Sequence, residues 1–137
     1  MSTPLNVLLL EDSEDDAQLV LRELRKAGYD LSYTRVDNLI SFRKELDDSR
    51  WQVIIADYSM PGFSGLEALG LMQQMEVDLP FLLVSGTIGE DLAVAAMKAG
   101  AHDYLMKDDL ARLIPAISRE LQEAKERQAR RSAEKEL

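Results

Sequence analysis

The chain has 137 residues, about the length of one domain, with no cysteine and one histidine, so disulfides, thiolate chemistry and histidine-rich metal clusters are excluded. Its formal net charge of −9 disfavours direct binding to nucleic acid. It has no signal peptide and no apolar run near the roughly 18 residues that span a bilayer, which predicts a soluble, cytoplasmic protein without a membrane contact.

Short apolar runs alternate along the chain with segments of helical spacing. Three runs are continuous, as in strands that are covered on both faces of a parallel sheet, and two mix polar and apolar residues, as at sheet edges. In chain order, the five predicted strands are 7–10, 31–36, 53–56, 81–84 and 103–106.

Each predicted strand is followed by apolar residues three and four positions apart, which is the spacing of an amphipathic helix. The second helix has Asp37 or Asn38 as its N-cap, and the third begins with a capping box of Ser64 and Glu67. The expected buried faces are Ala17, Val20, Leu21 and Leu24 before a stop at Gly28; Leu39, Phe42 and Leu46; Leu66, Leu69 and Met72; Leu92, Ala95, Ala96 and Ala99; and Ile117, Leu121 and Ala124.

This alternation predicts an α/β fold, a single doubly wound five-stranded parallel sheet with right-handed crossovers. Apolar strands at the centre and mixed strands at the edges fit the strand order 2-1-3-4-5, the flavodoxin-like arrangement. Met72, Met75, Met97 and Met106 are expected to fill the core, and His102 to lie in a solvated turn.

The fifth helix extends past the expected domain. Pro115 suits a first helical turn, so residues 109–114 are expected to form a turn before it, and no Gly or Pro interrupts residues 115–137. Because the apolar stripe stops at Ala124, we expect a domain over residues 1–124 and a projecting helical linker over residues 125–137. That linker would lead to an output module or form a homodimer by self-contact, with Arg127, Arg130 and Arg131 on a solvated face.

Polar residues follow four of the five predicted strands, where doubly wound sheets bind ligands. Three carboxylates in one crevice repel one another unless a cation lies among them, and oxygen ligands without His or Cys suit Mg²⁺. Singly, these residues have ordinary structural explanations, since acids cap helices and lysines lie on surfaces. Their joint position favours a functional site: Glu11 and Asp12; Asp57; Ser85, Gly86 and Thr87; and Lys107.

Residues 57–65, DYSMPGFSG, follow the pattern D-x-x-M-P-x-x-x-G. Over roughly residues 5–124, the chain resembles the response-regulator receiver domains of two-component signalling. The resemblance rests on this pattern and on the matching spacings of the acidic pair Glu11-Asp12, of Ser85-Gly86, of Tyr104 and of Lys107. Two departures stand out, since Asp108 follows Lys107 where many receivers have proline and Ser85 replaces the commoner threonine.

The resemblance implies a phosphoacceptor domain rather than an enzyme with a turned-over substrate. Asp57 would accept a phosphoryl group from the phosphohistidine of a sensor histidine kinase or histidine phosphotransfer protein. The metal ligands would be Glu11, Asp12, Asp57 and the backbone carbonyl of Ser59, around Mg²⁺. Lys107, Ser85 and Gly86 would bind the phosphoryl group, Ser85 and Tyr104 would switch a partner-binding surface, and Ser59 and Thr87 would tune dephosphorylation.

Two other functions fit parts of the pattern. One is a Mg²⁺-dependent phosphatase with an aspartyl nucleophile, similar to the haloacid-dehalogenase-like enzymes. Those enzymes require a second acid two residues after the nucleophile, and this chain has Ser59 at that position. A receiver-like protein-binding module that takes no phosphate would not need the intact set of acids, hydroxyl and lysine.

Overall fold

Five parallel strands form the central sheet of the computed structural model, which describes residues 2–86 and 90–136. The strand order is β2-β1-β3-β6-β7, so the predicted flavodoxin-like order 2-1-3-4-5 is confirmed, with β6 and β7 as the fourth and fifth strands of this sheet. All four neighbouring pairs are parallel. The strands are β1 (Thr3–Leu10), β2 (Tyr29–Val36), β3 (Val53–Asp57), β6 (Phe81–Ser85) and β7 (Asp103–Met106).

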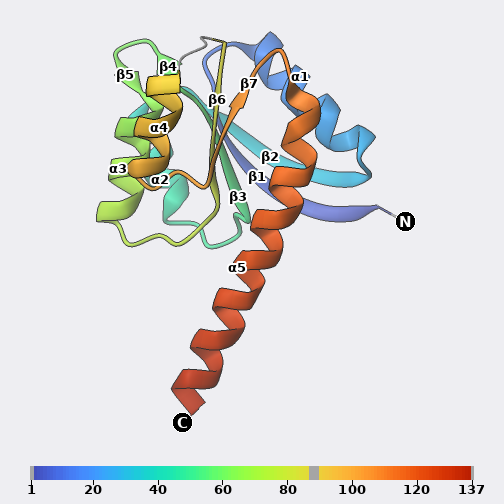
Figure 1. Ribbon diagram of the computed structural model, residues 1–137, viewed down its shortest axis with the longest axis vertical. Coiled ribbons are helices and arrows are strands. Elements are labelled where there is room, and N and C mark those ends of the chain that lie inside the picture. The colour runs from blue at the N-terminus through green and yellow to red at the C-terminus, as the bar shows by residue number, and fades with distance from the viewer. Residues whose placement is uncertain (1, 87–89, 137) are drawn as a thin grey trace.

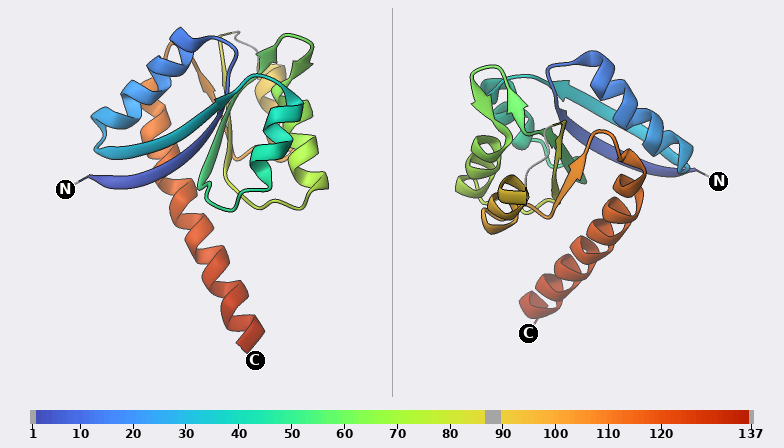
Figure 2. Two further views of the ribbon diagram at one scale, coloured as in Figure 1. Left: turned by 180° about the vertical axis from the view of Figure 1, so that it is seen from behind. Right: turned by 45° about the horizontal axis from the view of Figure 1, so that its top comes forward.

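Helices cover both faces of the sheet (Figures 1 and 2). On one face, α1 (Glu14–Lys26) and α5 (Leu113–Glu136) enclose one apolar core. On the other, α2 (Leu39–Leu46), α3 (Gly65–Gln74) and α4 (Glu90–Lys98) enclose a second core. Among the helices of the described residues, none is both long and apolar enough to cross a membrane.

Local sequence signals set several helix ends. Of the two candidate caps for α2, Asn38 is the one used, because its side-chain oxygen accepts the Ser41 N–H at 2.8 Å. Ser64 caps α3 by accepting the Glu67 N–H at 3.3 Å. Gly28 follows the end of α1 with a φ of 95°, a conformation that favours glycine.

A small antiparallel hairpin follows β3 and was not predicted from the sequence. Its strands are β4 (Ser59–Met60) and β5 (Phe63–Ser64). Pro61 and Gly62 form the turn between them, and Gly62 has a φ of 84°, which agrees with the third position of a type II turn. The hairpin connects β3 directly to α3.

The predicted packing of α4 is partly wrong. Ala96 is fully buried, but Ala95 and Ala99 are exposed, and Met97, expected in the core, has 48% of its surface exposed. Alanine is small enough to be compatible with either environment, so the periodicity of this segment did not discriminate between its faces.

The last helix starts earlier than predicted and is packed against the body over its N-terminal part. A 3₁₀ turn, η1 (Leu110–Arg112), precedes α5, which begins at Leu113, so that Pro115 lies within its first turn. Leu113, Ala116 and Ile117 are buried, and the C-terminal half projects away from the body (Figure 1).

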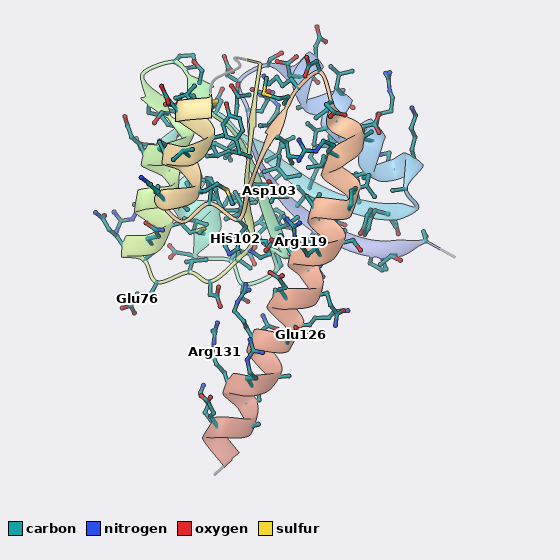
Figure 3. The ribbon with its side chains drawn as sticks, viewed as in Figure 1. Glu76, His102, Asp103, Arg119, Glu126 and Arg131 are labelled. Atoms are coloured by element: carbon teal, nitrogen blue, oxygen red, sulfur yellow. The ribbon has the colours of Figure 1, made fainter. Side chains whose placement is uncertain are left out.

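Two of the three arginines expected on a solvated face of this segment, Arg127 and Arg131, form ion pairs instead, whereas Arg130 is exposed as expected. Arg127 Nη2 lies 3.5 Å from a carboxylate oxygen of Asp78, and Arg131 pairs with the other oxygen of the same side chain. Figure 3 labels Arg131 on the projecting half of α5. These pairs join two segments far apart in the sequence, so no local pattern could have predicted them.

His102 also lies in a different environment from the expected solvated turn. The side chain is half-buried, and its Nδ1 accepts the Phe81 N–H at 3.0 Å, while its own backbone N–H donates to the Phe81 carbonyl at 2.9 Å. Burial lowers the pKa of His102. Next to it in the chain, Asp103 pairs with Arg119 of α5 at 2.9 Å, and both residues are labelled in Figure 3.

Candidate functional site

Three acidic side chains converge where β1 and β3 end. Leu10 is paired with Ala56, so the next residues of both strands, Glu11 and Asp57, lie beside each other at the same edge. Both are buried, with 4% and 9% of their surfaces exposed, whereas Asp12 is exposed. The predicted convergence of these three acids is therefore present in the structure.

The acidic group has the geometry of a cation site. Glu11, Asp12 and Asp57 each offer a carboxylate oxygen, and these oxygens lie within 4.8 Å of one another. Glu11 Oε2 is buried without a hydrogen-bond partner among the described residues. Burial, reinforced by Asp57, raises the pKa of Glu11 to about 7. An oxygen-only set that includes one buried carboxylate oxygen without a hydrogen-bond partner among the described residues fits a hard ion such as Mg²⁺.

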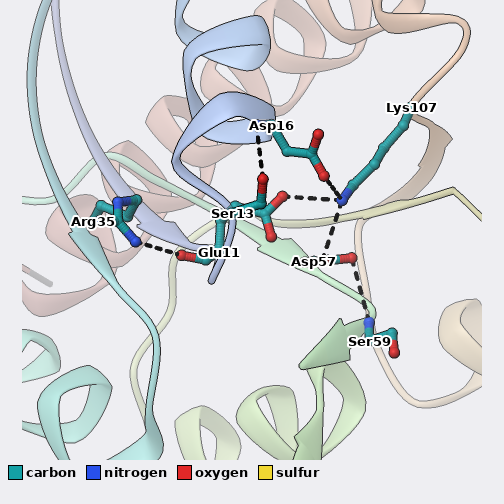
Figure 4. A network of polar contacts seen from close by, with 7 residues as sticks. All are labelled: Glu11, Ser13, Asp16, Arg35, Asp57, Ser59 and Lys107. Carbon is teal, nitrogen blue, oxygen red and sulfur yellow. Dashed lines mark hydrogen bonds and ion pairs between the residues drawn. The ribbon is translucent and has the colours of Figure 1, made fainter. Parts of the chain in front are cut away.

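Lys107, just after β7, places a positive charge among the same acids (Figure 4). Its Nζ lies 3.0 Å from Glu11 Oε1 and 3.2 Å from Asp57 Oδ2. A third carboxylate, that of Asp16, lies closer still, at 2.6 Å. Burial lowers the pKa of Lys107, but the hydrogen bonds and charges of these three acids outweigh it and raise the pKa above its usual value.

Asp16 is a site residue that the sequence pattern did not reveal. An acid at this position is expected to favour the start of a helix, and Asp16 does lie in the first turn of α1, where its N–H donates to Ser13 Oγ at 3.2 Å. Its contact with Lys107 spans 91 positions in the sequence. Acids before a helix are common, so no local signal distinguishes this one.

The backbone around Asp57 leaves no room for a side chain at Gly65. The Gly65 N–H donates to the Tyr58 carbonyl at 2.8 Å, and a Cβ at Gly65 would lie 2.7 Å from the Asp57 carbonyl oxygen. It would also lie 2.4 Å from the Leu83 side chain. The last glycine of the D-x-x-M-P-x-x-x-G pattern is therefore required by the close approach of α3 to the end of β3.

Further hydrogen bonds hold the Asp57 carboxylate and the backbone of Glu11. The Ser59 N–H donates to Asp57 Oδ1 at 3.3 Å, as Figure 4 shows, so the residue proposed to offer its carbonyl to a metal is next to that carboxylate. Arg35 of β2 donates to the Glu11 carbonyl at 3.1 Å, and the Glu11 N–H donates to the Val36 carbonyl at 3.0 Å. Arg35 carried no sequence signal, because it is one polar residue on a mixed edge strand.

The remaining predicted residues lie on the neighbouring strands. Ser85 is the last residue of β6 and is 2% exposed, and its carbonyl accepts the Lys107 N–H at 2.9 Å. Gly86 is exposed, and Tyr104 of β7 is half-buried against the apolar core beneath α2, α3 and α4. The peptide bond between Lys107 and Asp108 is trans. Thr87 lies outside the described residues.

A doubly wound parallel sheet with acids and a lysine gathered at the carboxyl ends of its strands defines a ligand-binding α/β domain, and sequence similarity gives its family. Residues 7–118 match the response regulator receiver domain, so the chain belongs to that family. The C4-dicarboxylate transport transcriptional regulatory protein DctD of Pseudomonas aeruginosa is 35% identical over 105 residues, 74% of this chain and 21% of that protein. The transcriptional regulatory protein PrrA of Mycobacterium leprae is 32% identical over 107 residues, 78% of this chain and 45% of that protein.

Solved structures agree with this assignment. The signal receiver domain of a protein described as a LuxO repressor, from Vibrio parahaemolyticus, has a TM-score of 0.80 and 28% identity over 92% of this chain and 96% of that one. The structure FixJ-N has a TM-score of 0.74 and 27% identity over 86% of this chain and 94% of that one. The chain spans less than half of the two curated regulators, so it corresponds to their receiver portion.

Proposed function

We propose that this receiver domain is phosphorylated on Asp57 by a phosphohistidine of a sensor histidine kinase or histidine phosphotransfer protein. An Asp57 carboxylate oxygen forms a bond to phosphorus as the phosphorus–nitrogen bond breaks, and the imidazole nitrogen keeps the electron pair. The product is an acyl phosphate on the domain itself, so the reaction is a self-modification rather than the turnover of a free substrate. The observation that carries the proposal is the Lys107 ammonium 3.2 Å from the buried Asp57 carboxylate.

Several groups around Asp57 would each offset part of the negative charge at the site. Receiver domains of this family bind Mg²⁺, and Glu11, Asp12, Asp57 and the Ser59 carbonyl are the groups that would hold it. When bound, the ion supplies positive charge that offsets the carboxylates and the transferring phosphoryl oxygens. Lys107, which contacts Glu11 and Asp57, contributes a second positive charge, since phosphoryl transfer depends mainly on positioning and charge neutralisation.

The response to phosphorylation would run through β6 and β7. Ser85 would donate its hydroxyl hydrogen bond to a phosphoryl oxygen and Gly86 would leave space for that group, with Thr87 and Ser59 tuning its hydrolysis. Tyr104, on the neighbouring strand, would then turn further into the core and change the surface that a partner recognises. The support for this step is the burial of Ser85 and the half-buried position of Tyr104.

Labelling with acetyl phosphate and Mg²⁺, followed by intact mass, tests the proposal. The wild-type chain should gain one phosphoryl group and Asp57→Asn none, because an amide is a poor nucleophile. Asp37→Asn is the matched control, since Asp37 is an exposed acid that follows the neighbouring strand β2. An unmodified wild type would overturn the proposal in favour of a protein-binding module, and an Asp57→Asn variant labelled like the control would place the nucleophile elsewhere.

We further propose that α5 beyond Ala124 is the linker through which the domain acts in the cytoplasm, toward an output module or a second copy of the chain. The support is its length, its exposed residues and the output regions that its curated relatives have beyond their receiver portion. Deleting residues 126–137 should abolish any concentration-dependent dimer in analytical ultracentrifugation. A chain that is monomeric with and without the tail would rule out self-association.

A further inference from the structure

The shortest of the three ion-pair contacts of Lys107 is made by a residue to which the proposed function gives no role. The Lys107 ammonium is nearer to Asp16 Oδ2, at 2.6 Å, than to Glu11 or Asp57, at 3.0 and 3.2 Å. Asp16 belongs to α1 rather than to a strand end, and 36% of its side chain is exposed. Figure 4 shows its carboxylate and that of Asp57 on different sides of Lys107 Nζ.

These three contacts use the whole hydrogen-bonding capacity of the ammonium. A lysine Nζ has three N–H donors and no acceptor, and here the three donors face three carboxylates. A phosphoryl oxygen on Asp57 can be bound by Lys107 only when one of these contacts is released. Glu11 and Asp57 are buried at the strand ends and belong to the proposed metal site, whereas Asp16 lies outside it and is part-exposed.

We propose that Asp16 is a positioning residue that holds Lys107 in the unphosphorylated domain and releases it to the phosphoryl group. This inference rests on the proposed function and adds a restraint to it. An interaction that is present in the ground state and lost on the way to the transition state raises the barrier. Asp16 therefore slows the phosphorylation of Asp57.

The test is the rate at which acetyl phosphate labels the variants in saturating Mg²⁺, followed by intact mass. In this reaction the bond from phosphorus to the acetyl oxygen breaks, acetate leaves with the electron pair, and Asp57 gains the phosphoryl group. Asp16→Asn should react about two- to fivefold faster than wild type, the range that corresponds to a part-exposed ion pair. Asp15→Asn is the matched control, because it removes the same charge from the same helical turn at an exposed residue outside the three contacts of Lys107.

A second comparison separates positioning from a general effect of charge. Asp16→Asn should have no effect on the slow labelling of a Lys107→Ala background, and Asp16→Glu, which keeps the carboxylate, should restore a rate near that of wild type. An Asp16→Asn variant no faster than Asp15→Asn, or one equally accelerated without Lys107, would overturn the inference. Failure of the wild type to be labelled would instead overturn the proposed function, so the two failures are distinguishable.

Discussion

Two glycines of the same helix should respond to alanine in opposite directions. At Gly65, the first residue of α3, an added Cβ would lie 2.4 Å from Leu83 Cδ2 and 2.7 Å from the Asp57 carbonyl oxygen, so the strand end or the helix must move. Overpacking of this kind costs about 1–3 kcal/mol. At Gly70, nothing lies within 4 Å of the added Cβ, and alanine in a helix interior stabilises by about 0.5–1 kcal/mol.

The assay is urea unfolding followed by far-ultraviolet circular dichroism, with the fluorescence of the buried Trp51 as a second probe. The free energies of unfolding of the two variants should differ by about 1.5–4 kcal/mol, or roughly 1–2 M in the urea midpoint at a typical slope. Gly65→Ala should lie below wild type and Gly70→Ala above it. If Gly65→Ala were as stable as wild type, the close approach of α3 to the Asp57 backbone would not be the reason for glycine there.

Three further outcomes follow from the helix cap, the half-buried histidine and the arginine pairs on Asp78. Asn38→Ala should lower the free energy of unfolding by about 1 kcal/mol in urea titration, because the Ser41 N–H loses its acceptor, and an unchanged midpoint would contradict the cap. The pKa of His102 in the folded protein lies below its ordinary value of 6.5, so the unfolded chain binds the proton more readily and the contribution of His102 to stability is lost as pH falls below about 6.5. The free energy of unfolding, measured over a pH series, should show this loss in wild type and not in His102→Asn. Asp78→Ala should increase amide hydrogen exchange in the C-terminal half of α5, where an unchanged exchange pattern would mean that the pairs with Arg127 and Arg131 do not order the helix.

The sheet was predictable because strands that are buried on both faces appear in the sequence as short continuous apolar runs. Residues 53–56 and 81–84 are continuous apolar runs, and in the structure they form β3 and β6, each longer by one polar residue at its carboxyl end, Asp57 and Ser85 respectively. The acids and Lys107 were expected at one edge of the sheet because the carboxyl ends of parallel strands meet there. That expectation needs only the fold class and the strand ends.

The parts that were missed depend on contacts between distant segments. The apolar spacing of α4 could not select Ala96 over Ala95 and Ala99, because a methyl side chain is tolerated at both buried and exposed positions. Asp16 resembles any other acid in a first helical turn until α1 and the end of β7 are brought together. The two-residue strands of the hairpin are too short to show an alternating pattern.

Because α5 is attached to the body at two points, its rotation about its own axis is fixed. Ile117 is buried in the core, Arg131 pairs with Asp78, and the helix is continuous between them, so neither rotation about its axis nor sliding is free. Each residue advances an α-helix by about 100°. A domain joined to Glu136 by a continuous helix would therefore face a direction set by the number of residues between them. Inserting two residues would turn that domain to nearly the opposite side. Inserting a full heptad would almost preserve its orientation.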